Sequence, residues 1–192
     1  ADPYSLVTFP DNHDMDRFYT QVNEDLDLFK MGVAYILTLR GTPQLYYGTE
    51  ILMDNEGYPG DHGIIRTDFP GGWAGDEVNG FTGKGLTEDQ KEAKAYIKKL
   101  LNWRKTNEAI HNGKLMQFVP DGGFYVTFRY TDTSKVMTIL NKNEDATPLQ
   151  LDRFAEMLGG TKQGKDVMSG KAYKTSGTIN VPGKSAMILE IE

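Results

Sequence analysis

The first part of the chain alternates apolar and polar stretches in an order typical of a parallel sheet. Residues 4–9 are mostly apolar and predict a buried strand. Apolar residues then recur at helical spacing, which predicts a helix over residues 23–40, and residues 44–47 predict a second buried strand. A strand, a helix and a strand in this order indicate a βαβ unit, so polar residues that follow its strands are expected at the carboxyl edge of the sheet.

A second helix is predicted before the pattern changes at Gly113. Thr87-Glu88-Asp89-Gln90 is a capping box and predicts the start of a helix that ends near Gly113. Apolar and polar residues alternate over 124–130, as in an antiparallel strand with one buried face. The short strands predicted after Gly113 are 114–119, 124–130, 136–140, 147–151, 178–182 and 185–191. Residues 152–158 predict one or two helical turns, and the whole segment predicts a small all-β sandwich.

A long, glycine-rich stretch over residues 54–86 lies between the second predicted strand and the helix that begins at Thr87. A connection of this length within a compact domain is usually functional or disordered, and its aromatic residues argue against disorder. These aromatic residues are Tyr58, Phe69, Trp73 and Phe81. Such rings can stack on the faces of sugars or pin the loop to the rest of the protein, and the sequence favours neither.

Composition narrows the function. The 192 residues carry a net charge of −6, which argues against nucleic acid as a partner because phosphates are neutralised by clustered Lys and Arg. There is no Cys, and no apolar run approaches the roughly 18 residues of a membrane span. The sequence shows no signal peptide and does not begin with Met, so we expect it to be a piece of a longer protein.

The densest polar cluster follows the first predicted strand, in the segment 11–17. His13 and Asp14 there could bind a metal, but the other two histidines are remote in sequence. A nucleophilic triad would need a Ser or Cys elbow, and none is visible. A sugar site is better supported, because cleavage of a glycosidic bond needs carboxylates and sugar hydroxyls suit His and Asp side chains.

Two segments carry a resemblance to a known family. They are Phe9-Pro10-Asp11-Asn12-His13-Asp14, with Arg17 behind it, and Gly41-Thr42-Pro43-Gln44-Leu45-Tyr46-Tyr47-Gly48-Thr49-Glu50. Together they resemble the α-amylase family, glycoside hydrolase family 13, in the regions after its seventh barrel strand and at its eighth. The segment 65–73 resembles the neopullulanase and cyclomaltodextrinase branch, including starch-utilisation enzymes of gut bacteria.

The resemblance implies a fold and a division into domains. Residues 1–112 would supply the last two βα units of a (β/α)8 TIM barrel, and residues 113–192 a C-terminal antiparallel β-sandwich. A whole barrel of this type needs about 250 residues. We therefore expect the chain to be a C-terminal portion of a retaining enzyme that acts on α-1,4-glucans such as starch, pullulan, cyclodextrin or maltooligosaccharides.

The resemblance also implies roles for individual residues. Asp14 matches the third catalytic carboxylate, which grips and distorts the sugar at the cleaved bond. His13, Arg17 and Arg66 match substrate-binding residues, and Arg17 equally suits a structural role that orients neighbouring carboxylates. The nucleophile and the acid/base residue belong to strands that this chain lacks, so we expect the isolated chain to be inactive.

Partners and location follow from the same resemblance. The expected partners are an α-glucan and the missing N-terminal part of the barrel, and exposed strand edges leave self-association open. We expect no metal or other cofactor in this chain, with calcium, if any, bound elsewhere in the full-length enzyme. A periplasmic or other extracytoplasmic location is favoured over a cytoplasmic one. The alternative function is a non-catalytic carbohydrate-binding or scaffold protein in which the sandwich and loop 54–86 bind glucan.

Overall fold

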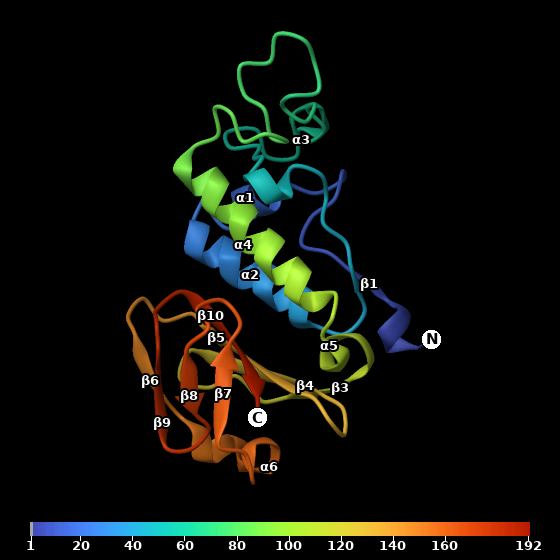
Figure 1. Ribbon diagram of the computed structural model, residues 1–192. Coiled ribbons are helices and arrows are strands. Elements are labelled where there is room, and N and C mark those ends of the chain that lie inside the picture. The colour runs from blue at the N-terminus through green and yellow to red at the C-terminus, as the bar shows by residue number, and fades with distance from the viewer. Residues whose placement is uncertain (1) are drawn as a thin grey trace.

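The computed structural model describes residues 2–192 and consists of a helical part resting on a part built of antiparallel strands (Figure 1). The helices are α1 (Phe18–Gln21), α2 (Leu26–Thr38), α3 (His62–Ile65), α4 (Glu88–Arg104), α5 (Glu108–Asn112) and α6 (Ala155–Leu158). The strands are β1 (Val7–Thr8), β2 (Thr42–Pro43), β3 (Lys114–Gln117), β4 (Phe124–Tyr130), β5 (Lys135–Asn141), β6 (Thr147–Gln150), β7 (Gln163–Asp166), β8 (Ala172–Lys174), β9 (Thr178–Val181) and β10 (Ser185–Ile191). This order confirms the predicted fold class, two βα units followed by an antiparallel β-domain.

The two parallel strands are shorter than predicted. β1 and β2 pair over two residues each, with Val7 opposite Thr42. The predicted second strand at 44–47 is wrong in position, because the chain already pairs with β1 directly after Gly41. Gly41 has a φ of +98°, and an added Cβ would lie 2.5 Å from the carbonyl oxygen of Leu6, so a glycine allows this close approach. Val7 is 52% exposed rather than buried, since within residues 2–192 β1 pairs only with β2.

Helix α2 begins later than the predicted residue 23. Asn23 and Glu24 adopt left-handed backbone angles, with φ of 56° and 54°, and therefore cannot continue a right-handed helix. Asp25 is the N-cap instead, and its carboxylate accepts hydrogen bonds from the amides of Asp27 and Leu28. Helix α4, by contrast, begins at the predicted capping box, with Thr87 as its N-cap.

The β-domain is a sandwich of a six-stranded and a two-stranded sheet. The strand orders are β3-β4-β5-β10-β7-β8 and β6-β9. A hydrophobic cluster fills the space between the sheets; its fully buried members include Phe128, Ile139 and Val181. Strands β7 and β8 are not predicted by the sequence, because Gln163–Asp166 and Ala172–Lys174 contain few of the apolar residues on which such a prediction depends.

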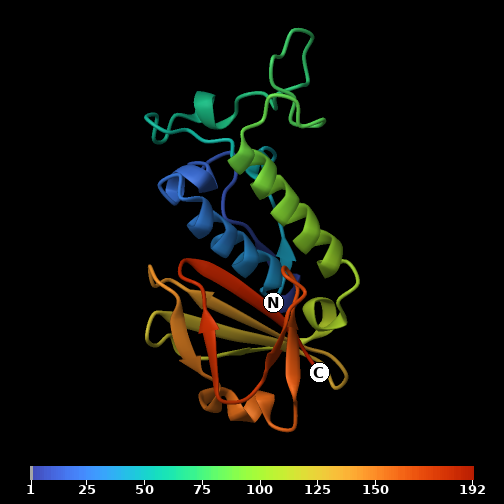
Figure 2. The same ribbon diagram turned by 60° about the vertical axis from the view of Figure 1, so that its left-hand side comes forward.

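The outer face of the large sheet is also buried. Ile188 of β10 and Val136 of β5 belong to the same hydrophobic cluster as Phe29 and Val33 of α2. Figure 2 shows α2 and α4 lying over this sheet. The prediction of a half-exposed strand at 124–130 is therefore wrong: the helices cover its polar face, where Arg129 is only 1% exposed.

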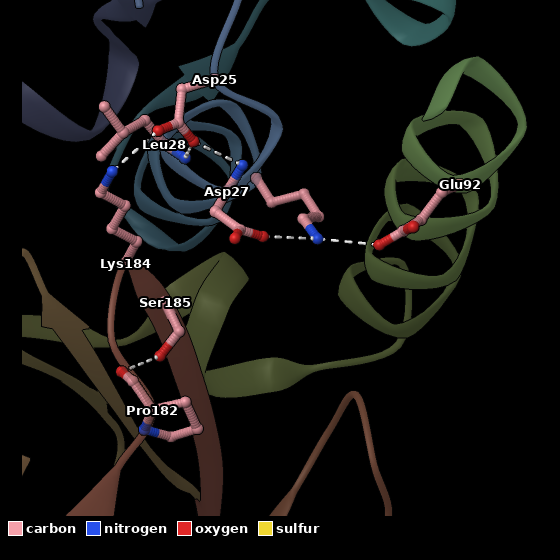
Figure 3. Close-up of polar contacts among 8 residues, drawn as sticks. Asp25, Asp27, Leu28, Glu92, Pro182, Lys184 and Ser185 are labelled. Carbon is pink, nitrogen blue, oxygen red and sulfur yellow. Dashed lines mark hydrogen bonds and ion pairs between the residues drawn. The ribbon is translucent and has the colours of Figure 1, made fainter. Parts of the chain in front are cut away.

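Ion pairs at the edge of this interface join the layers. Lys184, between β9 and β10, donates to Asp25 at 3.1 Å (Figure 3) and pairs with Glu144 at 2.9 Å. Within the helical layer, Lys30 of α2 lies 2.8 Å from Glu92 of α4. The predicted domain boundary at residues 112 and 113 falls between α5 and β3, where the chain passes from the helical layer to the sheet.

Candidate active site at the end of strand β1

A tight turn after β1 presents two of the predicted site residues to solvent. The side chain of Asn12 accepts a hydrogen bond from the amide of Asp14 at 2.7 Å, which fixes the turn locally. The side chains of His13 and Asp14 are 64% and 60% exposed. The turn therefore points an imidazole and a carboxylate outward from the carboxyl end of a parallel strand.

Arg66 reaches the same turn from the long loop. Its terminal nitrogen donates to Oδ1 of Asp14 at 2.8 Å, and its Nε donates to the carbonyl oxygen of His13 at 2.9 Å. Nε2 of His13 lies 3.2 Å from Oδ2 of Asp14. Asp14 is thus held between two nitrogen-bearing side chains, and three of the four predicted site residues lie together.

His62, which is remote from His13 in the sequence, is a fourth member of this cluster. Its Nδ1 lies 3.1 Å from the guanidinium of Arg66 and 3.4 Å from the carbonyl oxygen of His13. The signal in the sequence was its spacing: His62 and Arg66 are four residues apart around α3, which places them on one side of a helical turn.

Arg17 does not join the exposed cluster, contrary to its predicted role in substrate binding. It is fully buried, and its Nε donates to the carbonyl oxygen of Ile65 at 2.9 Å. The guanidinium also donates to the carbonyl oxygen of Tyr47 and lies 4.2 Å from the ring centroid of Tyr46. Arg17 therefore connects three chain segments beneath the site, in agreement with its structural interpretation.

The two other aspartates of the segment hold it in place. Asp11 is fully buried and accepts from the amide of Phe18 at 2.8 Å and the hydroxyl of Thr49 at 3.1 Å. Burial raises the pKa of Asp11 above its ordinary value, although both hydrogen bonds act in the opposite direction. Asp16 accepts from the amide of Gly60 at 2.7 Å, and this bond is the main reason that its pKa is lowered.

Asn55 connects these loops from the inside. Its side-chain nitrogen donates to Asp16 at 2.7 Å, and its side-chain oxygen accepts from the amide of Arg17 at 2.8 Å. Its own amide donates to the hydroxyl of Thr20 at 2.9 Å. Asn55 is 1% exposed, so these bonds fix the start of the long loop against the segment that carries Asp14.

Residues 2–192 contain no group of three or more His, Asp or Glu side chains placed to hold a metal ion. In the same residues, no helix combines the length and apolar character required to cross a membrane.

The comparison with known families fits this arrangement. Residues 2–102 match the family model of the α-amylase catalytic domain. The chain belongs to the α-amylase family. Residues 115–190 match the C-terminal domain of cyclo-malto-dextrinases, which confirms the resemblance to that branch.

Curated relatives of this α-amylase-family chain include larger bacterial proteins. It is 32% identical over 184 residues to a cyclomaltodextrin glucanotransferase of Niallia circulans, covering 91% of this chain and 22% of the relative. It is 29% identical over 191 residues to an alpha-amylase of the same organism, covering 94% of this chain and 32% of the relative. The chain thus spans less than a third of the length of these proteins, 22% and 32%.

Solved structures of the family share the fold. AmyP in complex with maltose superposes with a TM-score of 0.78 at 20% identity, over 96% of this chain and 40% of AmyP. CldA, a cyclomaltodextrin glucanotransferase with a three-domain ABC distribution, gives a TM-score of 0.72 at 25% identity, over 98% of this chain and 37% of CldA.

Proposed function

We propose that this chain forms part of a retaining glycoside hydrolase that acts on α-1,4-glucans. Membership of the α-amylase family supports this proposal, as do relatives that carry the names cyclomaltodextrin glucanotransferase and alpha-amylase. Among the structural neighbours, AmyP was solved with maltose, a short α-glucan.

The single observation that carries the proposal is the position of Asp14. Its carboxylate is exposed at the end of a parallel strand, 2.8 Å from Arg66 and 3.2 Å from His13. Both oxygens retain accessible lone pairs, so they can accept hydrogen bonds from two hydroxyl groups of one sugar ring. A carboxylate that holds a ring in this way can favour the flattened, oxocarbenium-like geometry of glycosidic cleavage.

The neighbours of Asp14 have distinct proposed roles. His13 would donate a further hydrogen bond to the same sugar, because its ring is exposed beside the carboxylate. Arg66 balances the charge of Asp14 and fixes its orientation through the His13 carbonyl group. Arg17 is a positioning residue in this proposal, since its buried guanidinium holds the chain behind the site.

Asp14 alone cannot break the glycosidic bond. The retaining mechanism needs a nucleophile and an acid/base carboxylate about 5 Å apart. We propose that both belong to other strands of the complete barrel, so that the 192-residue chain assembles a functional site only together with them.

The test is the substitution Asp14→Asn in the longer protein that contains this chain. An amide keeps the size of the side chain but loses the charge, so turnover of maltoheptaose is expected to fall roughly 100- to 1,000-fold. Far-ultraviolet circular dichroism should stay unchanged, because Asp14 is exposed and contributes to no hydrophobic cluster.

The matched control is Asp132→Asn, which neutralises an exposed aspartate in a turn of the β-domain. It should leave turnover within about twofold of the unmodified protein, whereas the 192-residue chain alone should show no turnover. Near-normal turnover by the Asp14→Asn protein would refute the proposed role.

A further inference from the structure

His62 lies beside the proposed active site and has no role in the proposed function. Its Nδ1 lies 3.1 Å from a terminal nitrogen of Arg66 and 3.4 Å from the carbonyl oxygen of His13. A guanidinium can only donate hydrogen bonds, so Nδ1 of His62 accepts from Arg66 and carries no proton. The contact therefore fixes the neutral tautomer of His62, with its proton on Nε2.

His62 is one of three acceptors that hold the guanidinium of Arg66. The terminal nitrogen that reaches His62 also donates to Oδ1 of Asp14 at 2.8 Å, while Nε donates to the carbonyl oxygen of His13 at 2.9 Å. The side chain of Arg66 is 46% exposed, so water competes for each of these donors. Hydrogen bonds, rather than burial, keep Arg66 on Asp14, and the loss of an acceptor loosens that hold.

Protonation of His62 would turn its contact with Arg66 from attraction into repulsion. A histidine side chain ordinarily gains its charge between about pH 8 and pH 5. On His62 the added proton occupies Nδ1, so the bond from Arg66 is lost and two cations face each other at 3.1 Å. The charged Nδ1 can instead donate to the carbonyl oxygen of His13, which Nε of Arg66 already uses. Protonation thus acts against two of the three hydrogen bonds of Arg66.

The other charged and titratable groups around His62 and Arg66 are Asp61, next to His62 in the chain, and His13, Asp14 and Asp16, from the turn after β1. Asp61 accepts from two amides of α3, and Asp14 pairs with Arg66. The amide of Gly60 is the main reason that the pKa of Asp16 is lowered, and the charge of His62 is a smaller one. Aspartate ordinarily titrates near pH 4, so the groups that change charge between about pH 5 and pH 8 are the imidazoles.

We propose that His62 is a positioning residue that holds Arg66 on Asp14 while its ring is neutral and releases Arg66 when its ring is protonated. This inference rests on the proposed function, which gives Asp14 a sugar to hold. Arg66 fixes the orientation of the Asp14 carboxylate, so the release of Arg66 weakens the grip on the sugar. The site is complete at neutral pH and loosened in acid.

Nuclear magnetic resonance of the 192-residue chain tests this contact independently of turnover. The Nε–H resonance of Arg66 should move between about pH 8 and pH 5 in step with the ring resonances of His62. His62→Asn keeps an acceptor oxygen close to the position of Nδ1 but cannot gain a charge, so the resonance should stay in place. His13→Asn removes the other imidazole of the cluster and serves as the matched control, in which the movement should persist.

Turnover of maltoheptaose by the longer protein provides the second measurement. The kcat/KM of each variant is divided by that of the unmodified protein at the same pH, which cancels the pH dependence of the other catalytic groups. The ratio for His62→Asn should rise roughly threefold from about pH 8 to pH 5, because only the unmodified protein releases an exposed ion pair in acid. The control is His111→Gln, at the third histidine of the chain, whose ratio should stay constant.

The outcomes separate this inference from the proposed function. A constant ratio for His62→Asn, or an Arg66 resonance that follows His13 or neither ring, would overturn the positioning role even if Asp14→Asn abolishes turnover. Near-normal turnover by the Asp14→Asn protein would refute the proposed function instead, whereas an Arg66 resonance that follows His62 would still support the hold of His62 on Arg66.

Discussion

Residues of one type take on different roles within a single short segment. Asp11, Asp14 and Asp16 lie within six positions of one another, yet one is buried, one is exposed beside a guanidinium, and one accepts a backbone amide. The surroundings, rather than the side chain itself, decide whether each carboxylate supports the fold or faces a substrate.

The two structural aspartates should change stability with pH in opposite senses. The pKa of Asp16 is lowered, so its stabilisation is complete above the ordinary value of 3.8 and is lost as the pH falls through the folded-state pKa. The pKa of Asp11 is raised, so ionised Asp11 costs stability above its folded-state pKa, and this cost disappears as the pH falls toward 3.8.

Urea unfolding of Asp16→Asn and Asp11→Asn at several pH values tests this pair. Asp16→Asn should lower the free energy of unfolding by about 1 kcal/mol near neutral pH, and this loss should shrink as the pH falls below 3.8. The change in the free energy of unfolding that Asp11→Asn causes should be most favourable near neutral pH and less favourable in acid. A pH dependence of the same sign in both variants would contradict the assignment.

Local capping decided where each long helix begins. The sequence predicted the start of α4 because Thr87 and Gln90 form a reciprocal pair of bonds within four residues. It missed the start of α2 by three residues, because Asn23 and Asp25 are both acceptable N-caps. The left-handed backbone angles of Asn23 and Glu24 exclude these residues from the helix, so Asp25 is the N-cap. Nothing in the local sequence requires those angles.

Removing the cap of α4 should destabilise the chain measurably. Thr87→Ala leaves the amide of Gln90 without its side-chain acceptor, so the free energy of unfolding in urea should fall by about 1 kcal/mol. Thr87→Ser keeps the hydroxyl and serves as the matched control, with an expected change well below that of Ala. Equal losses in the two variants would show that the methyl group of Thr87, and not its hydroxyl, matters.

At the scale of the molecule, the helical layer and the sheet share one hydrophobic cluster. Ile188 of β10 packs with Phe29, Val33 and Leu37 of α2, and all four are fully buried. The parts that the sequence separates at residue 113 are therefore expected to unfold together.

Two isoleucines on opposite faces of the large sheet test this coupling. Ile188→Ala opens space beneath the helices, and Ile139→Ala opens space between the sheets. Each should lower the free energy of unfolding by about 3 kcal/mol and shift the same single transition in scanning calorimetry. Val119→Ala, at a site 77% exposed, is the control and should change little. Two separate transitions, only one of which responds to each variant, would contradict a shared core.

The sequence by itself determined the class of fold, the family and the position of the Asp14 turn. Each of these depends on local patterns: apolar periodicity, a capping box, and a run of residues after a strand. The tertiary structure decided that Arg17 is buried, that His62 contacts Arg66 beside Asp14, and that helices cover the polar face of β4. These outcomes depend on contacts between residues far apart in the chain, and the burial that such contacts create is not encoded in any single stretch of sequence.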